Sequence, residues 1–364
     1  MKRWLAAVLA LATAGVLHAH QDITTRAVAA RRAELQQLLG RYIAGDHEGV
    51  ATAFAKLDPA GRIALRSLMA ERDGPKPLAR AAFALEFGAA AMRAPSPVEV
   101  DMFVRYSHQQ LARRPSKVGT NPAEDRFELL AHQIGLALLE GGGNWPGHRT
   151  YLKEASPRIV ALEAAYPGLP TRFALMRAMD AAMQCCSDLL VRGAIPMVAI
   201  VSAGTPRQTP TPPPTPEYAL LQFEIAARDE ALAQEALVRA AFLQQRLARV
   251  PDGLKFLDRA QTRGDTVIDY AAALVRAAMF DLAGPPDAAA ESYGAAMRLA
   301  AGAQVPAIGR AAALQRAGQI DEAVAAANHA RHIAPDGFDP WPVFLRADAR
   351  FVDAWMVELR GLLK

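Results

Sequence analysis

The chain has few of the residue patterns that mark common enzymes and metal-binding proteins. Its 364 residues include only two cysteines, which are adjacent, and its 8 histidines form no zinc-protease motif. No serine lies in a nucleophile-elbow pattern, and no Lys-Ser or Lys-Thr pair follows the glycines of residues 141–143. These absences leave no recognisable catalytic constellation, so we expect no cofactor and no metal.

The chain also has little excess charge and no convincing strand pattern. Its formal net charge is +4, from 41 basic and 37 acidic residues that are mixed along the sequence. This mixture differs from the basic stripe of a nucleic-acid-binding protein, so we expect no nucleic-acid partner. Apolar residues recur with a period near 3.6, which indicates an all-α protein.

Long apolar runs are confined to the N-terminus. Two basic residues precede a mostly apolar run over residues 4–17. This order is typical of a secretory signal peptide, 1–19, with cleavage after Ala19; cleavage after Ala14 is the alternative. The run is shorter than the ~20 residues that a transmembrane helix needs. We therefore expect a periplasmic or secreted protein with no membrane span in the mature chain.

Helical patterns fill most of the chain on both sides of a proline-rich segment. We divide it into an N-terminal half of degenerate helical repeats, 22–192, a Pro-rich loop or linker, 193–216, and a C-terminal half, 217–364. The middle segment is either an inserted surface loop, a hinge between the halves or a proline-rich ligand. Predicted helices before the clear repeats span 22–44, 46–57, 59–71, 77–93, 97–113, 123–140, 148–165, 171–192, 217–229, 230–249 and 251–263.

Two stretches of the C-terminal half repeat each other at a distance of 34 residues, 270–303 and 304–337. Gly284 recurs as Gly318, in the turn between two helices, where a positive φ suits glycine. Small residues recur on one face of the second helix, where they let two helices approach closely. These small residues are Ala289, Ala296, Ala323 and Ala330. The period predicts stacked helix-turn-helix units that bury their apolar faces against their neighbours.

With this spacing the chain resembles a tetratricopeptide-repeat (TPR) protein. Tyr293 and Phe280 supply the aromatic residues expected in the first unit, and Trp341 opens a shortened third unit. Residues 347–364 are predicted to form a terminal capping helix. Its apolar stripe consists of Phe351, Trp355, Leu359 and Leu362. The resemblance implies a TPR-like α-solenoid of antiparallel helix pairs, degenerate in the N-terminal half.

The resemblance also implies a function, since the first helix of each TPR unit lines a concave groove. In this register five residues are candidates for partner binding: Leu274, Asp281, Ile308, Gln315 and Arg316. Such a surface suits an amphipathic helix or an extended apolar peptide of another protein. We therefore expect a binding scaffold with no catalysis of its own. The alternatives are an enzyme with an unrecognised site and a self-assembling structural subunit, which would be a homo-oligomer.

Two pairs of potential metal ligands allow a second interpretation. Cys186 lies on a helix stripe with Met176, Met179 and Met183, which we interpret as core with Cys185 beside it; a Cu(I) site or a redox site is the alternative. Side chains of adjacent residues point about 100° apart in a helix, so a disulfide between these cysteines requires a strained ring. His329 and His332, three residues apart, are interpreted as solvent-exposed and not as metal ligands.

Overall fold

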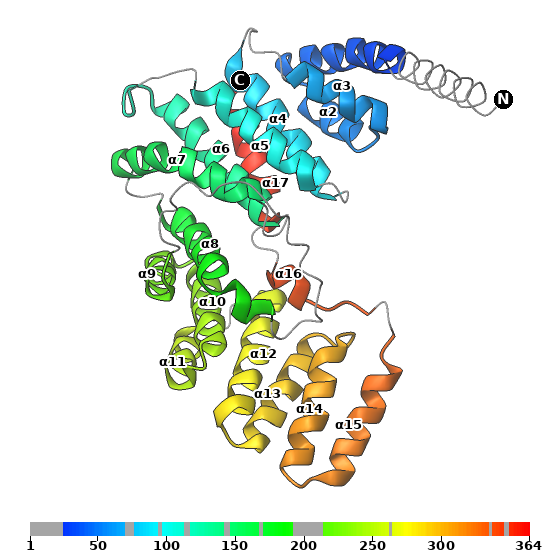
Figure 1. Ribbon diagram of the computed structural model, residues 1–364, viewed down its shortest axis with the longest axis vertical. Helices are drawn as coiled ribbons and strands as arrows, with labels where there is room; N and C mark the ends of the chain where they lie inside the picture. The colour runs from blue at the N-terminus through cyan, green and yellow to red at the C-terminus, as the bar shows by residue number, and fades with distance from the viewer. Residues whose placement is uncertain are drawn as a thin grey trace, which may run out of the picture. The chain divides into compact units, whose positions relative to one another are not determined.

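A computed structural model shows an all-α protein (Figure 1). The structure describes residues 25–69, 76–93, 97–112, 117–141, 146–166, 170–191, 214–261, 264–334, 337–345 and 349–364. No strand occurs among these residues, which confirms the predicted fold class. The predicted signal peptide and most of the Pro-rich segment lie outside the described residues.

The chain divides into two compact units, and it passes between them twice. The first unit holds the residues up to Ala165 together with Asp348–Lys364, and the second holds Tyr166–Ala347. The sequence pattern predicts the division at the Pro-rich segment instead. The helices on either side of that segment, α8 (Pro170–Val191) and α9 (Pro216–Ala226), pack on each other within the second unit. The two helices that flank the segment therefore belong to one unit.

Helices of the first unit mostly begin at a proline, and their bounds lie within a few residues of the predicted ones. Proline suits the first turn because its missing N–H would have no intrahelical partner there. After a first helix over residues 25–43, they are α2 (His47–Phe54), α3 (Pro59–Met69), α4 (Pro77–Arg93), α5 (Pro97–Ala112), α6 (Pro122–Gly141) and α7 (Pro146–Ala165). Helix α6 contacts α4, α5 and α7.

The core of the first unit is built around a chain of aromatic rings. Tyr42 and Phe54 both make edge contacts with Phe83, at centroid distances of 5.5 and 4.9 Å. Phe54 also meets Phe87 edge-on at 5.4 Å, and Phe87 meets Phe103 at 4.2 Å. All five side chains are buried. Edge-to-face geometry adds to the apolar burial of such rings, so large interlocking side chains hold this unit together.

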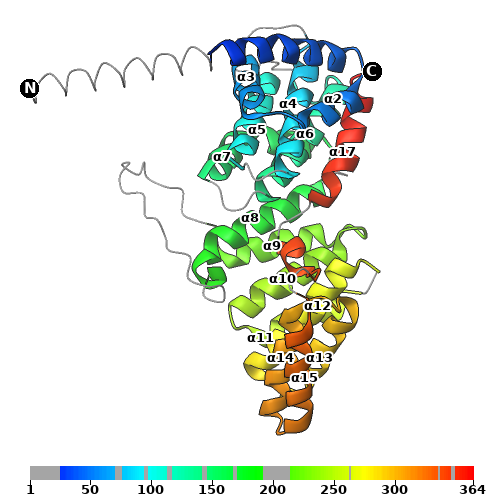
Figure 2. The same cartoon turned by 90° about the vertical axis from the view of Figure 1, so that its right-hand side faces the viewer.

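The last helix of the chain, α17 (Ala349–Gly361), packs on α6 and α4 in the first unit. Figure 2 shows it in red beside α6. The apolar stripe that faces this unit has Val352, Met356 and Leu359 fully buried. Helix α17 therefore completes the first unit, whereas the sequence pattern predicts it as the cap of the repeats.

Two ion pairs fix α17 in this place. The guanidinium of Arg360 binds both carboxylate oxygens of the buried Glu86 on α4, with Nη2 to Oε2 at 2.7 Å. Tyr42 also donates to Glu86, at 3.3 Å. On α6, Arg126 pairs with Glu358 at 2.7 Å. Because a buried carboxylate is costly without a partner, the Arg360 contact selects this docking position.

The second unit is a series of helices in which every helix from α8 to α15 contacts the next. Helices α8, α10 and α12 also contact one another in turn, and α16 packs on α12. The helices after α9 are α10 (Ala233–Arg246), α11 (Val250–Arg259), α12 (Thr266–Ala283), α13 (Pro286–Leu299), α14 (Gln304–Arg316), α15 (Ile320–His332) and α16 (Trp341–Leu345). Helices α12 to α15 coincide with the two predicted repeats, and Figure 1 shows them side by side. We refer to α12–α15 as the array.

Alanine fills most of the core of the array. The four alanines singled out by the repeat spacing, Ala289, Ala296, Ala323 and Ala330, are all buried, as predicted. Three of them, Ala289, Ala296 and Ala323, share a core cluster with six further buried alanines and four large buried residues, Tyr270, Leu274, Tyr293 and Leu314. Small side chains let the helices approach closely, so the array is held by many short contacts.

The two repeat glycines serve different purposes. Gly318 has φ +79°, in the left-handed region, as predicted for the turn between α14 and α15. The same prediction is wrong for Gly284, which has extended backbone with φ −121° and ψ −177°. A Cβ at Gly284 would lie 2.5 Å from the Phe280 ring, so this position needs glycine for space and not for its backbone angles.

Candidate functional site

One face of α14 carries three of the five partner-binding candidates, Ile308, Gln315 and Arg316, together with Val305 and Ala312. Val305 and Ile308 are 49% and 54% exposed. Ala312 is half-buried, and Gln315 and Arg316 are exposed. The spacing of three to four residues places all five on one side of the helix. The face is apolar at the N-terminal end of α14 and polar at its C-terminal end.

The polar end of this face is joined to α12. The carboxylate of Asp281 pairs with Arg316 and accepts a hydrogen bond from the Tyr293 hydroxyl at 2.6 Å. Burial, followed by the hydrogen bond to Asp281, raises the pKa of Tyr293 above its ordinary value, so the phenol stays a donor. Two of the five predicted residues, Asp281 and Arg316, are thus brought together across consecutive repeats. Exposed ion pairs contribute only about 0–1 kcal/mol to the free energy of unfolding. The main effect of this pair is therefore to fix the positions of its two side chains on the surface.

Tyr293 reaches Asp281 only because α14 has a glycine opposite its ring. A Cβ at Gly309 would lie 2.5 Å from two carbons of that ring. The glycine therefore lets α13 and α14 close over the tyrosine, and the Asp281 carboxylate can receive the hydroxyl. Gly309 was not among the residues that the repeat spacing singled out.

Leu274 is not part of an exposed groove, and its prediction as a surface residue is wrong. Its side chain is only 7% exposed and belongs to the same core cluster as Tyr270, Ala289 and Tyr293. Ala271, one turn earlier on α12, is fully buried. Its cluster includes residues of α13 and α14, and Trp341 of α16 also packs against it, since α16 lies on α12. The predicted groove surface is therefore open on α14 and covered on α12 at Ala271 and Leu274.

Aromatic side chains hold α16 in this position. Phe344 is 1% exposed and lies in one cluster with Val238 of α10 and Ala271 of α12. Trp341 and Phe344 stack at 5.3 Å, and Phe242 of α10 meets the Trp341 ring edge-on at 5.2 Å. We call the surface of α10 and α12 beneath α16 the α16 site; it includes Glu235, Val238, Arg239, Phe242, Ala271 and Val275.

A buried charge pair anchors the backbone of α16. Arg239 donates to the Phe344 carbonyl at 2.7 Å, and its guanidinium carbon lies 4.4 Å from the centre of the Phe344 ring. The same guanidinium pairs with Glu235 at 2.8 Å, and both side chains are buried. Before the helix, the Asp339 carboxylate accepts from the Trp341 N–H at 2.9 Å. Hydrogen bonds from a charged donor are worth about 1.5–3 kcal/mol, so the Arg239 contact is a strong one.

A pocket of about 580 Å³ opens beside the same repeats, between α13 and α14. Its lining mixes both signs of charge, with Asp287 and Glu291 against Arg298 and Arg310. Gln319 at its edge donates to Asp287 at 2.9 Å. The balanced charges make the pocket a poor attractor for a strongly charged ligand.

The first unit contains a buried cluster of titratable groups that the sequence did not indicate. The hydroxyl of Tyr151 on α7 lies 2.6 Å from His108 Nε2 on α5 and 3.3 Å from His132 Nδ1 on α6. The two imidazoles are 4.1 Å apart. His132 Nε2 lies 3.6 Å from Glu128, which binds Arg158 at 2.6 Å.

Burial sets the protonation states of this cluster. It holds the pKa of His108 well below its ordinary value, with a further contribution from the neighbouring His132, and it lowers the pKa of His132 as well. Burial also raises the pKa of Tyr151 well above its usual range. The cluster is therefore a network of neutral imidazoles and a phenol inside the helix packing. We assign it to the core of the first unit.

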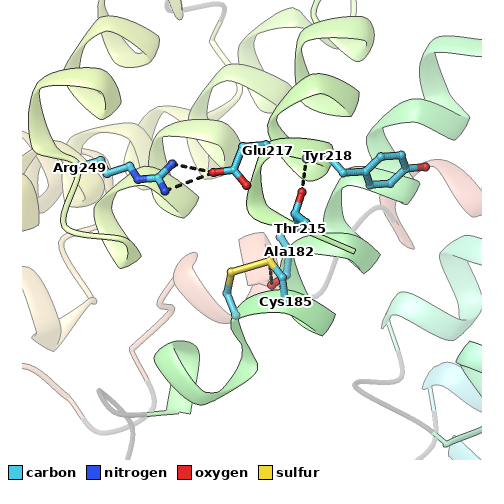
Figure 3. The surroundings of a disulfide bond; sticks show 7 residues. Ala182, Cys185, Thr215, Glu217, Tyr218 and Arg249 are labelled. Carbon is cyan, nitrogen blue, oxygen red and sulfur yellow. Dashed lines mark hydrogen bonds and ion pairs between the residues drawn. A yellow bond between two sulfur atoms is a disulfide. The ribbon is translucent and has the colours of Figure 1, made fainter. Parts of the chain in front are cut away.

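The adjacent cysteines are joined by a disulfide in the second unit (Figure 3). The bond forms where α8 leaves helical geometry, at Cys186 with φ −129° and ψ 16°, which is how neighbouring side chains meet despite the expected 100° separation. Cys186 is buried with Met179 against Phe223 of α9, and Cys185 is half-buried. The interpretation of the stripe as core is confirmed for Cys186 and Met179.

Figure 3 also shows how α9 begins beside this disulfide. The Thr215 hydroxyl accepts from the Tyr218 N–H at 3.2 Å and caps the helix. Glu217 in the first turn accepts from Arg249 at 3.2 and 3.3 Å, which ties the start of α9 to the start of α11. These contacts thus hold the first turn of α9, directly after the Pro-rich segment.

His329 and His332 are both exposed on α15, in agreement with their interpretation as solvated residues. Among the residues that the structure describes, no group of three or more His, Cys, Asp or Glu is arranged to hold a metal ion. Within the same ranges, no helix combines the length and the apolar character that crossing a membrane requires.

In comparisons with protein-family models, with curated proteins and with solved structures, nothing matched the chain significantly.

Proposed function

We propose that this chain is an exported TPR-like α-solenoid that binds a segment of another protein along the first helices of its repeats. The observation that carries the proposal is the open face of α14, where Val305 and Ile308 are exposed next to the Asp281–Arg316 pair. Exposed apolar side chains rimmed by polar groups are typical of protein-binding surfaces. The serial contacts of α8 to α15, and the 34-residue spacing of the array, support stacked helix pairs of TPR type.

The ligand class follows from the shape and chemistry of this face. Its apolar end can bury two or three side chains of a helix or an extended peptide, whereas Gln315 and Arg316 can bind polar groups at the other end. We place the protein in the periplasm or outside the cell, on the strength of the signal-peptide pattern of residues 1–19. N-terminal sequencing of the protein from its native host tests the cleavage after Ala19.

Affinity capture from a native envelope extract tests the binding face. The tagged wild type is compared with Val305→Arg/Ile308→Arg, which places two charges on the apolar end of the α14 face. The matched control is Ile320→Arg/Val324→Arg, because these residues on α15 are equally exposed, at 56% each. We expect a partner that the wild type and the control retain and the α14 variant loses. Leu274 is unsuitable for this test because a charge at its buried position would disrupt the core.

The rival functions give different results in the same experiment. A self-assembling subunit would capture untagged copies of itself, and binding of one partner by all three proteins would place the site elsewhere. An enzyme would retain no stable partner. Loss of binding in the α15 control as well as in the α14 variant would contradict a face restricted to α14.

A further inference from the structure

We infer that α16 is an internal ligand of the second unit, and that a partner segment with two aromatic residues three positions apart displaces it from the α16 site. This inference rests on the proposed binding function and adds the ligand motif and its competition with the chain's own segment. The relevant segment is residues 337–345, with Trp341 and Phe344 as its aromatic pair.

The first step of the argument is how this segment is bound. Phe344 is almost fully buried among side chains of two different helices, and Trp341 stacks on it and contacts Phe242. A large aromatic side chain that fills an apolar pocket is the usual anchor of a peptide ligand. By contrast, Leu345, next to the pair, is 46% exposed. Binding is therefore concentrated in two side chains of one short helix.

The second step concerns the polar contact. Arg239 binds the Phe344 backbone carbonyl, and not a side chain, while Glu235 neutralises the guanidinium. Any segment with an aromatic residue at this position presents the same carbonyl. The α16 site therefore recognises the aromatic pair and a backbone carbonyl, and its specificity depends little on the rest of the ligand sequence.

The third step is the continuity of this site with the open face. Both surfaces belong to the same series of helices, since α12 lies under α16 and its Asp281 is paired with Arg316 of α14. Segment 337–345 follows α15 in the chain, so it returns to cover the earlier helices of its own unit. A partner that occupies both the α14 face and the surface of α12 beneath α16 has to displace this segment.

Tethering explains why an outside ligand must compete. A segment linked to its own site has an effective concentration on the order of mM. A free peptide of identical sequence therefore binds the wild-type protein poorly even if its intrinsic affinity is moderate. Removing the tethered side chains opens the site to the free peptide, and this difference can be measured without knowing the natural partner.

A labelled peptide of residues 337–345, GFDPWPVFL, provides the test by fluorescence anisotropy with the full chain. We expect Trp341→Ala/Phe344→Ala to bind it at least 10-fold more tightly than the wild type does. The matched control is Phe351→Ala/Trp355→Ala, which removes the same two residue types from α17, where they stack at 6.1 Å in the other unit. This control should bind the peptide as weakly as the wild type.

Two altered peptides test the motif itself. A peptide with alanine in place of both aromatic residues should show no binding, and a peptide with Trp and Phe adjacent should bind at least 10-fold more weakly than the native sequence. Equal binding of all three peptides to the variant would overturn the motif. Equal binding of the native peptide by wild type and Trp341→Ala/Phe344→Ala would overturn the internal ligand.

A second measurement covers the case in which Trp341→Ala/Phe344→Ala does not fold. Excess peptide added to the wild type should speed the hydrogen exchange of the Phe344 amide, which donates to Pro340 at 3.0 Å in the bound segment. Unchanged exchange at saturating peptide would overturn displacement. Neither peptide measurement involves the captured partner. A negative peptide result therefore contradicts the displacement of α16 without contradicting the α14 binding face. A negative capture result contradicts the α14 binding face without changing the peptide result.

Discussion

The first unit and the array of the second unit fill their helical cores in opposite ways. The first unit interlocks large rings, with Phe83 between Tyr42 and Phe54, and it also buries two histidines and a tyrosine. The array is packed mainly by alanines. The comparison teaches that a core of large residues is most sensitive to lost volume and a core of small residues to added volume.

Removing the central ring should damage the first unit most. Phe83→Ala deletes a fully buried side chain that contacts two other rings, and we expect it to lower the free energy of unfolding by about 3–5 kcal/mol. Hydrogen exchange resolved by peptide should show lost protection in the first unit, with α12–α15 little changed. Phe83→Leu, which keeps most of the volume, should lose less than half as much. Equal losses in both units would contradict the separation of the two cores.

Adding volume to the core of the array should also lower the free energy of unfolding, by less than Phe83→Ala does in the first unit. Ala289→Leu inserts three carbons at a position with no exposed surface on α13, and we expect a loss of about 1–3 kcal/mol. Ala325→Leu, at an exposed position on α15, is the matched control and should change stability by less than about 0.5 kcal/mol. Urea denaturation of both variants measures the difference. If Ala289→Leu left the free energy of unfolding unchanged, the array core would have enough empty space for the larger side chain.

Lowering the pH should reduce the stability of the first unit more than that of the array. The pKa values of His108 and His132 are lowered by burial, so below their ordinary value of 6.5 the unfolded chain binds protons that the folded first unit does not. Its stability is therefore constant above pH 6.5 and falls below it, by at most about 1.4 kcal/mol per pH unit for each histidine. Burial lowers the pKa of His47 as well, with the same sign.

Hydrogen exchange at pH 7.5 and 5.5, corrected for intrinsic rates, measures this effect. Protection should fall in peptides of α5 and α6 and stay nearly constant in those of α14. His329→Gln/His332→Gln, at exposed positions in the array, should leave the pH dependence unchanged. A first unit whose protection is independent of pH in this range would disprove the contribution of the buried imidazoles.

The smallest effect should come from the open face. Val305→Ser/Ile308→Ser removes two exposed apolar side chains, and we expect a change in unfolding free energy within about 0.5 kcal/mol. Thermal unfolding is the measurement, with Leu314→Ser in the buried core of the same helix as the contrast. A large loss at the exposed pair would mean that these side chains stabilise the fold, and would weaken the case for a binding face.

Local features of the fold were predictable from the sequence because they depend on neighbouring residues. Prolines and the helical period placed most helix ends within a few residues, and the 34-residue repeat identified the buried alanines. For the site, the register correctly put Ile308, Gln315 and Arg316 on an exposed face. The Asp281–Arg316 pair joins residues 35 apart, one repeat period plus one, so the register brings them close.

Features that depend on distant segments could not be predicted. Leu274 lies in a core cluster against which Trp341 of α16 packs, and nothing in the pattern around Leu274 signals that α16 returns to α12. Likewise, the buried cluster in the first unit draws His108 and Tyr151 from positions 43 residues apart on different helices. The Glu235–Arg239 pair has a visible signal, since residues four apart share a helix face, but many exposed pairs have the same spacing.

The docking of α17 on the first unit has a consequence for the order of folding during synthesis. Ribosomes add about 5–20 residues per second, so roughly 10–40 s pass between completion of α7 and completion of α17. Throughout this delay Glu86 lacks Arg360, and the faces of α4 and α6 that receive α17 stay uncovered. The second unit, whose helices are contiguous in the chain, can be complete earlier. The part of the protein made first is therefore the part finished last.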